Sequence, residues 1–358
     1  MGSARQNVRL SGDYQFKGVD ATLLENENLR LFILDGKGGD IIEFRDKRTD
    51  VDVLWRSPHD WQVPDSPRLS ATDDTPWETQ YPGGWQINAP LAGWGGSVSG
   101  TQYPLHGESA LLAWDTEVLA HTANRARLRL STELVRYPFE IHREIELRAG
   151  ESTVEFRDRL VNTADVPLEY IWQQHIALGP PLVGPPASIS LPDSSCYVDP
   201  SYPSNPTFEH HRLEPGAKFT WPTAPGTDGG TADLSRFPPR DATIHDQIYA
   251  TDLSAGWYAV TNPEIDLGFG VSFPTDPFEC LWYWQAFGGA EVSPYFGRNY
   301  NIGLEPTTAH PAGSIPDAQR ENGSMKILGP GEEVTATVTA GTFGADAVGD
   351  RPDPLPWH

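Results

Sequence analysis

The sequence predicts an all-β protein, built as a large antiparallel β-sandwich. Three observations carry this prediction: several segments alternate apolar and polar residues, turn signals are frequent, and helical periodicity is almost absent. The chain has 358 residues, of which 34 are glycine and 33 are proline. These residues interrupt every window long enough for a helix. We therefore expect two large sheets packed face to face.

The first expected element is a hairpin near the N-terminus. Residues 29–34 (LRLFIL) and 41–44 (IIEF) form two apolar runs. The glycine-rich segment 35–39 (DGKGG) separates them and supplies the turn.

Three further strands are expected in the middle of the chain. Residues 125–134 and 140–147 alternate charged and apolar side chains, which is the period of a half-buried strand. Residues 148–151 then turn the chain, and residues 153–161 return it. Three neighbouring antiparallel strands of this length indicate a large meander.

The last expected strands lie toward the C-terminus. Residues 257–260 and 267–273 are apolar runs that flank a turn at Asn262-Pro263-Glu264. Residues 334–343 are rich in threonine and valine and predict a closing strand.

Two segments, 58–104 and 180–243, read as long loops, and such loops in a compact β-protein usually carry function. The length alone suggests about two domains. No linker or shift in composition divides the strand pattern, however. We therefore expect one domain that spans residues 1–358.

Composition excludes several classes of function. Lysine and arginine total 26 and aspartate and glutamate total 49, which gives a net charge of −23. Such a charge repels phosphate backbones, so a nucleic-acid partner is not expected. No apolar run predicts a signal peptide or a membrane span, and Cys196 and Cys280 are too few for a disulfide framework. We expect a cytoplasmic protein with reduced cysteines and no membrane partner, either a monomer or a dimer.

Three short clusters could carry chemistry, because each places a titratable side chain beside glycine or proline after an aromatic or apolar stretch. The clusters are 103–109, 172–181 and 300–306. They contain His106, His175 and Glu305. Histidine exchanges protons near neutral pH, and burial can raise the pKa of a glutamate toward the same range.

In order and spacing these clusters resemble the galactose mutarotase-like (aldose 1-epimerase) superfamily. The family pattern is a His-Gly pair, a second histidine well downstream and a late Glu-Pro pair, matched here by His106-Gly107, His175 and Glu305-Pro306. The resemblance extends from the first hairpin to the closing strand and implies the supersandwich fold of that family.

The residues in and around these motifs most resemble a divergent, little-characterised branch of the family. The run Gly83-Gly84-Trp85-Gln86 stands ahead of His-Gly-Glu, as expected for that branch. The usual asparagine-rich run is missing, although Asn88 could serve part of its role. The usual Ser-Tyr-Phe-Asn after the second histidine is replaced by residues 176–181 (IALGPP).

The resemblance implies an isomerase that opens and recloses a sugar ring at the anomeric centre, without a cofactor or metal. Glu305 would be the general base and His175 the general acid, and His106 would hydrogen-bond the substrate. Asp246 lies where the family has an aspartate that binds a sugar hydroxyl.

Other residues could bind the carbohydrate. If residues 282–285 (WYWQ) form a strand, Trp282 and Trp284 share one face, where their rings can pack on a sugar. Side chains that could bind a sugar hydroxyl or an anionic group are Gln285, Glu108, Trp85, Gln86, Arg56 and Arg143. Each could equally be a core or ion-pair residue. His210 and His211 are adjacent and would point in opposite directions on a strand, so no metal site is expected there.

Two alternatives stay open beside the aldose 1-epimerase. The same fold could serve another carbohydrate isomerase or a lyase, because fold does not determine function. The protein could also bind carbohydrate without catalysis. A neutral sugar is the default ligand, because an anionic one would need a local arginine against the net charge of −23.

Overall fold

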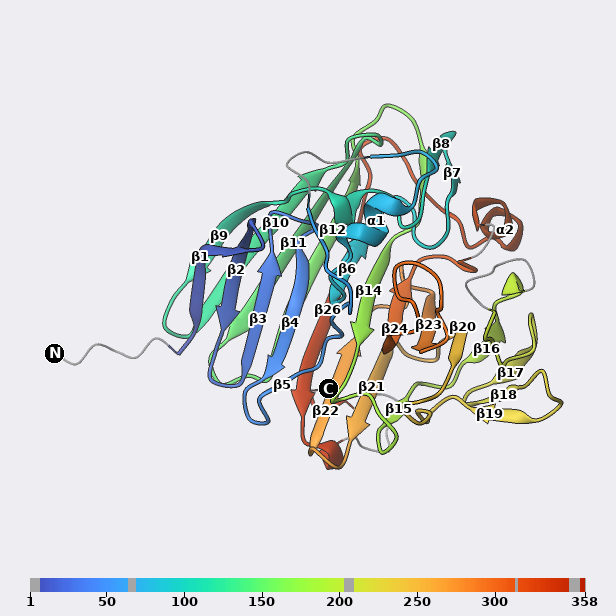
Figure 1. Ribbon diagram of the computed structural model, residues 1–358. Coiled ribbons are helices and arrows are strands. Elements are labelled where there is room, and N and C mark those ends of the chain that lie inside the picture. Colours follow the sequence, from blue (N-terminus) through green and yellow to red (C-terminus); the bar gives the residue numbers. More distant parts are fainter. Residues whose placement is uncertain (1–6, 64–68, 203–208, 313–314, 348–354, 358) are drawn as a thin grey trace.

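Two large antiparallel sheets lie one behind the other in the computed structural model (Figure 1). The structure describes residues 7–63, 69–202, 209–312, 315–347 and 355–357. Nearly all of the regular structure is strand, which confirms the predicted all-β sandwich. Neither helix of the described chain is long and apolar enough to cross a membrane.

In the described chain the larger sheet has 12 strands, and its central members form the floor of the pocket described below. In spatial order they are β1 (Arg9–Phe16), β2 (Val19–Glu25), β3 (Leu29–Leu34), β4 (Asp40–Asp46), β6 (Trp85–Asn88), β14 (Gln173–Leu178), β24 (Tyr300–Thr307), β23 (Cys280–Phe287), β20 (Ile244–Thr251), β16 (Ser195–Val198) and β17 (Lys218–Thr220), with β5 (Val51–Asp52) paired to β4.

The smaller sheet has eight strands within the described residues. In order they are β15 (Ser188–Ser190), β21 (Trp257–Asn262), β22 (Leu267–Ser272), β26 (Glu333–Phe343), β12 (Thr153–Asn162), β11 (Phe139–Arg148), β10 (Arg125–Glu133) and β9 (Asp115–His121). The predicted meander is confirmed, because β10 pairs with β11 and β11 with β12. The predicted hairpins β3–β4 and β21–β22 are also present.

The two segments expected to be long loops contain short elements, so that expectation was wrong in part. The first holds α1 (Thr75–Gln80), β6, and the ribbon β7 (Gly96–Val98) with β8 (Thr101–Tyr103). The second holds β15, β16, β17, and the ribbon β18 (Thr223–Pro225) with β19 (Thr231–Asp233). Strands of three or four residues are too short to show a period.

The remaining elements of the described chain are short. They are the ribbon β13 (Leu168–Tyr170) with β25 (Lys326–Leu328), the helix α2 (Ile315–Asn322), and the 3₁₀ turns η1 (Ser109–Leu111) and η4 (Ala345–Ala347).

Apolar side chains from both sheets interlock between the layers. The rings of Trp85 on β6 and Phe156 on β12 lie 4.5 Å apart, and those of Phe44 on β4 and Phe269 on β22 lie 5.3 Å apart. Because side chains alternate along a strand, the next residues of the larger sheet point to its other face. That outer face carries the candidate site.

Candidate active site

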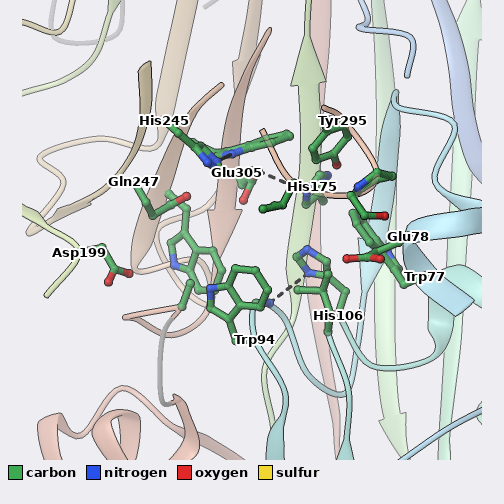
Figure 2. A pocket seen from close by; sticks show the side chains of 18 residues that line it. Trp77, Glu78, Trp94, His106, His175, Asp199, His245, Gln247, Tyr295 and Glu305 are labelled. Atoms are coloured by element: carbon green, nitrogen blue, oxygen red, sulfur yellow. Dashed lines mark hydrogen bonds and ion pairs between the residues drawn. The ribbon is translucent and has the colours of Figure 1, made fainter. Parts of the chain in front are cut away.

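A pocket of about 170 Å³ lies on the outer face of the larger sheet. Its floor comes from the neighbouring strands β14, β24, β23 and β20, and its walls from α1, from the segments around residues 93 and 106, and from residues 292–295 (Figure 2). His106, His175 and Glu305 all line it. Three side chains separated by long stretches of sequence are thus brought into one cavity.

His175 and Glu305 meet because their strands, β14 and β24, are neighbours in the sheet. The Nε2 atom of His175 lies 3.5 Å from Oε1 of Glu305. The imidazole of His106 stands nearly perpendicular to that of His175, with ring centres 5.0 Å apart. The arrangement is a compact cluster of three proton-exchanging groups.

Glu305 is 3% exposed, and burial raises the pKa of its carboxyl well above the usual glutamate range. Its Oε2 accepts a hydrogen bond of 3.0 Å from the side-chain amide of Gln173. Gly303 lies two residues earlier on the same face, and a Cβ there would come 2.1 Å from Oε1 of Glu305. A glycine at this position therefore leaves room for the carboxyl group.

His175 is uncharged near neutral pH. Burial lowers the pKa of its imidazole to about 3, and the positive charge of Lys37 contributes in the same direction. Lys37 is itself buried and ion-paired with Asp40. His175 can therefore accept a proton as a neutral base.

His106 is held in one orientation and one tautomer. Its backbone lies in the left-handed region at φ 61°, followed by Gly107 at φ 69°. The backbone N–H of Gly93 donates to Nδ1 of His106 at 3.1 Å, and the amide of Asn88 donates to the same atom at 2.9 Å. Since Nδ1 accepts, the hydrogen of the neutral ring sits on Nε2. Burial lowers the pKa of His106 well below its usual value, so the ring is a neutral donor.

Aromatic rings surround this cluster. Trp77 on α1 packs on His106 with ring centres 4.5 Å apart, and Trp284 lies 6.3 Å from His175. The indole N–H of Trp284 donates to Nε2 of His245 at 2.8 Å. Trp282 also lines the pocket, whereas Tyr283 contacts Trp221 instead, as strand alternation predicts. Such flat apolar walls suit the C–H faces of a sugar ring.

Two of the proposed sugar-binding residues point away from the pocket. Arg212 donates to both Oδ atoms of Asp246, from its backbone N–H and from Nε, and its guanidinium also donates to Gln285. Asp246, predicted to bind a sugar hydroxyl, is 0% exposed and is not among the residues that line the pocket. Its neighbours His245 and Gln247 do line the pocket. Alternation along β20 was the signal that could have identified them.

Trp85 and Arg143 lie between the sheets. The guanidinium of Arg143 makes two hydrogen bonds to Asp158, of 2.8 and 2.7 Å, and stacks over Trp85 at 5.2 Å. The indole of Trp85 donates to Gln174. Both side chains are buried between the sheets, Arg143 is paired with Asp158, and neither residue lines the pocket, so neither is available to bind an anionic sugar there.

The other three candidates also lie outside the pocket lining. Gln86 is buried and donates to Asp40 at 2.7 Å. Glu108 accepts from the backbone N–H of Arg136 at 2.9 Å, and burial raises its pKa. Arg56 is exposed in a separate open hollow, where it pairs with Asp52 at 3.0 Å.

Sequence reasoning missed several residues of the pocket wall. Besides His245 and Gln247 they are Trp77, Glu78, Trp94, Asp199 and Tyr295. They come from segments without strand periodicity, apart from the strand residues His245 and Gln247. Composition alone did not distinguish these tryptophans and acids from the many others in the chain.

No group of three or more metal-ligating side chains occurs among the described residues. His210 pairs with Glu291 at 3.3 Å. Cys196 and Cys280 are buried and unbridged, and burial raises the pKa of the Cys196 thiol to about 11.

Solved structures share this fold at low sequence identity. A candidate aldose 1-epimerase from Klebsiella pneumoniae superposes with a TM-score of 0.72 at 18% identity, over 95% of this chain and 84% of that one. A galactose mutarotase-like protein from Clostridium acetobutylicum gives 0.69 at 12% identity, over 95% and 100%. A candidate aldose 1-epimerase from Escherichia coli gives 0.59 at 15% identity, over 90% and 98%.

No curated protein matches the sequence. Residues 16–341 match the family described as "Domain of unknown function (DUF4432)". This match covers most of the chain, and the fold agrees with the galactose mutarotase-like proteins above. The chain therefore belongs to the DUF4432 family, and its fold is similar to that of the galactose mutarotase-like proteins.

Proposed function

We propose that the protein is an aldose 1-epimerase-like isomerase that interconverts the anomers of a sugar. One observation carries the proposal: His106, His175 and Glu305 converge in a single pocket walled by tryptophan rings. Two groups that can exchange protons with neighbouring oxygens are what ring opening requires.

The proposed reaction moves two protons and breaks one bond. One member of the pair takes the proton of the O1 hydroxyl, the C1–O5 bond breaks as the C1 carbonyl forms, and the other member protonates O5. Rotation about C1–C2 then exposes the other face of the aldehyde. The same two groups return the protons in the reverse sense as the ring closes.

The separation of His175 and Glu305 suits this chemistry. At 3.5 Å, Nε2 and Oε1 are too far apart for a strong direct hydrogen bond. O1 and O5 of a sugar are bonded to the same carbon, so each of these two oxygens can lie within bonding reach of one member of the pair. His106, as a fixed Nε2–H donor, would stabilise negative charge that develops on a substrate oxygen.

The pair works with one proton between its two members. Burial favours a neutral imidazole and a protonated carboxyl, so Glu305 gives the first proton and His175 accepts one. The family resemblance implies the opposite starting roles. The two assignments differ by one proton transfer within the pair, which titrates as a unit.

The pocket suits an uncharged sugar. Neither lysine nor arginine is among its lining residues, whereas Glu78, Asp199 and Glu305 are. A phosphate or carboxylate group there would lack a counter-charge.

The proposal is tested by NMR saturation transfer between the α and β anomers of a panel of neutral aldoses. Faster exchange with the protein than without it supports the proposal. Altered mass or new resonances would identify another isomerase or a lyase. Sugar binding without faster exchange would identify a carbohydrate-binding protein.

A further inference from the structure

A chain of buried hydrogen bonds links His106 to Glu305 underneath the pocket. The amide nitrogen of Asn88 on β6 donates to His106 Nδ1 and, at 2.9 Å, to Oε1 of Gln173 on β14. The amide nitrogen of Gln173 donates in turn to Oε2 of Glu305 on β24 at 3.0 Å. Asn88 and Gln173 are both 0% exposed.

The direction of every bond in this chain follows from one backbone group. The N–H of Gly93 can only donate, so His106 Nδ1 must be an acceptor. The Asn88 atom facing Nδ1 must then be its NH₂ group, whose second hydrogen requires an acceptor at Gln173. The carbonyl of Gln173 takes that place, which leaves its NH₂ group toward Glu305. Flipping either amide would set two acceptors or two donors against each other.

We propose that Asn88 and Gln173 are positioning residues that hold the exchangeable proton of Glu305 on Oε1, the oxygen that faces His175. This inference rests on the proposed function, because it concerns the proton that the reaction uses. It assigns roles to two side chains that do not line the pocket.

The donors around Glu305 decide which of its two oxygens can carry the proton. A proton on Oε2 would meet the NH₂ group of Gln173, and two donors would then face each other. A proton on Oε1 leaves Oε2 free to accept from Gln173 and lies toward Nε2 of His175 at 3.5 Å. The second hydrogen of Gln173 is also occupied, since Thr307 accepts it at 3.2 Å.

The first test is Gln173→Met, which keeps the side-chain length and removes the donor. Loss of a hydrogen bond to the ionised carboxylate raises the pKa of Glu305, so the alkaline limb of kcat/KM should move up by about one pH unit. We expect kcat to fall about tenfold, since the proton is no longer confined to Oε1. We expect KM to stay within about twofold, because Gln173 does not line the pocket.

A second variant, Asn88→Leu, removes the anchor of Gln173 and one donor to His106. We expect the same upward shift of the alkaline limb at smaller size. The matched control is Asn162→Leu: Asn162 is equally buried, also donates to two acceptors, and belongs to β12 in the other sheet. This control tests whether loss of stability alone explains the effect.

A readout without substrate separates this inference from the proposed function. Carboxyl ¹³C titration of the ligand-free protein should show the Glu305 resonance titrating at higher pH in Gln173→Met and Asn88→Leu than in the wild type. It should be unchanged in Asn162→Leu. If these shifts occur but the protein does not accelerate anomer exchange, the positioning role of Asn88 and Gln173 is retained and the epimerase proposal is refuted. If the Glu305 titration is unshifted in both Gln173→Met and Asn88→Leu, or shifts equally in the control, the positioning role is overturned.

Discussion

The Nε2 atom of His175 lies 3.5 Å from Oε1 of Glu305, and both side chains are almost fully buried. Burial acts on the two groups in opposite directions, because it penalises the charged form of each. The pKa of His175 falls to about 3 while that of Glu305 rises. One proton can therefore stay within this pair over a wide pH range.

The pH dependence of catalysis should reflect this pair. If the singly protonated pair is active, kcat/KM stays level through pH 6.5 on the acid side, because His175 gains a second proton only near pH 3. On the alkaline side it falls as Glu305 ionises, above the usual glutamate range. Steady-state anomer exchange measured from pH 4 upward checks this. Loss of kcat/KM centred near pH 6.5 on acidification would show a histidine of ordinary pKa.

The free energy of unfolding should also depend on pH through the lowered pKa of His175. The folded-state pKa of His175 is below its unfolded value, so the unfolded chain binds more protons between about pH 6.5 and 3. The wild type should therefore lose stability relative to His175→Asn as pH falls through this window, by up to about 1.4 kcal/mol per pH unit. Urea unfolding of both proteins at pH 7, 6 and 5 measures the gap. A gap independent of pH would contradict the burial effect.

Trp284 should contribute to sugar affinity more than to chemistry. Its half-buried indole faces His175 and donates to His245 within the pocket. Replacement by alanine should weaken sugar binding by about tenfold, as loss of an aromatic platform typically does. Quenching of tryptophan fluorescence by titrated sugar, compared with calorimetry, gives the dissociation constants. Equal affinity in both proteins would place the sugar elsewhere.

Arg143 should act on stability. Arg143→Met leaves the buried carboxylate of Asp158 uncompensated, which should cost about 3–5 kcal/mol of unfolding free energy. The double variant Arg143→Met with Asp158→Leu should recover much of this loss, because neither charge is then buried alone. Chemical denaturation of the three proteins tests the pair. If the folded single variant lost sugar affinity at unchanged stability, Arg143 would instead be a ligand residue.

Strand alternation explains how much of the site the sequence could predict. Trp282 and Trp284 could be assigned to one face, and the structure places both in the pocket. The same rule places His245 and Gln247 on one face of the strand and Asp246 on the other. It would have favoured His245 and Gln247 as pocket residues once Asp246 was excluded, yet the resemblance drew attention to Asp246. Its partner Arg212 lies in a segment without regular periodicity, so their ion pair had no sequence signal.

The chain of hydrogen bonds from His106 to Glu305 and the contact of Trp77 with His106 were beyond sequence reasoning for a different reason. Trp77 contacts His106 from the six-residue helix α1. This helix lies in the segment 58–104, which was predicted to be a loop because proline and glycine are frequent there. The family resemblance drew attention to Asn88, but nothing in the sequence connects it with Gln173, which lies opposite it only because β6 and β14 pair. Such contacts depend on which strands become neighbours, and a single sequence does not encode that locally.

Glu305→Gln tests the central claim most directly, because it keeps the shape of the side chain and removes its exchangeable proton. Exposed Arg56, outside the pocket, provides the control variant Arg56→Ala. By saturation transfer on an aldose that the wild type accelerates, Glu305→Gln should lower the exchange rate by about 10²–10⁴-fold. Sugar affinity should be largely retained, and Arg56→Ala should match the wild type. Undiminished exchange in folded Glu305→Gln would contradict the assignment of His175 and Glu305 as the acid–base pair.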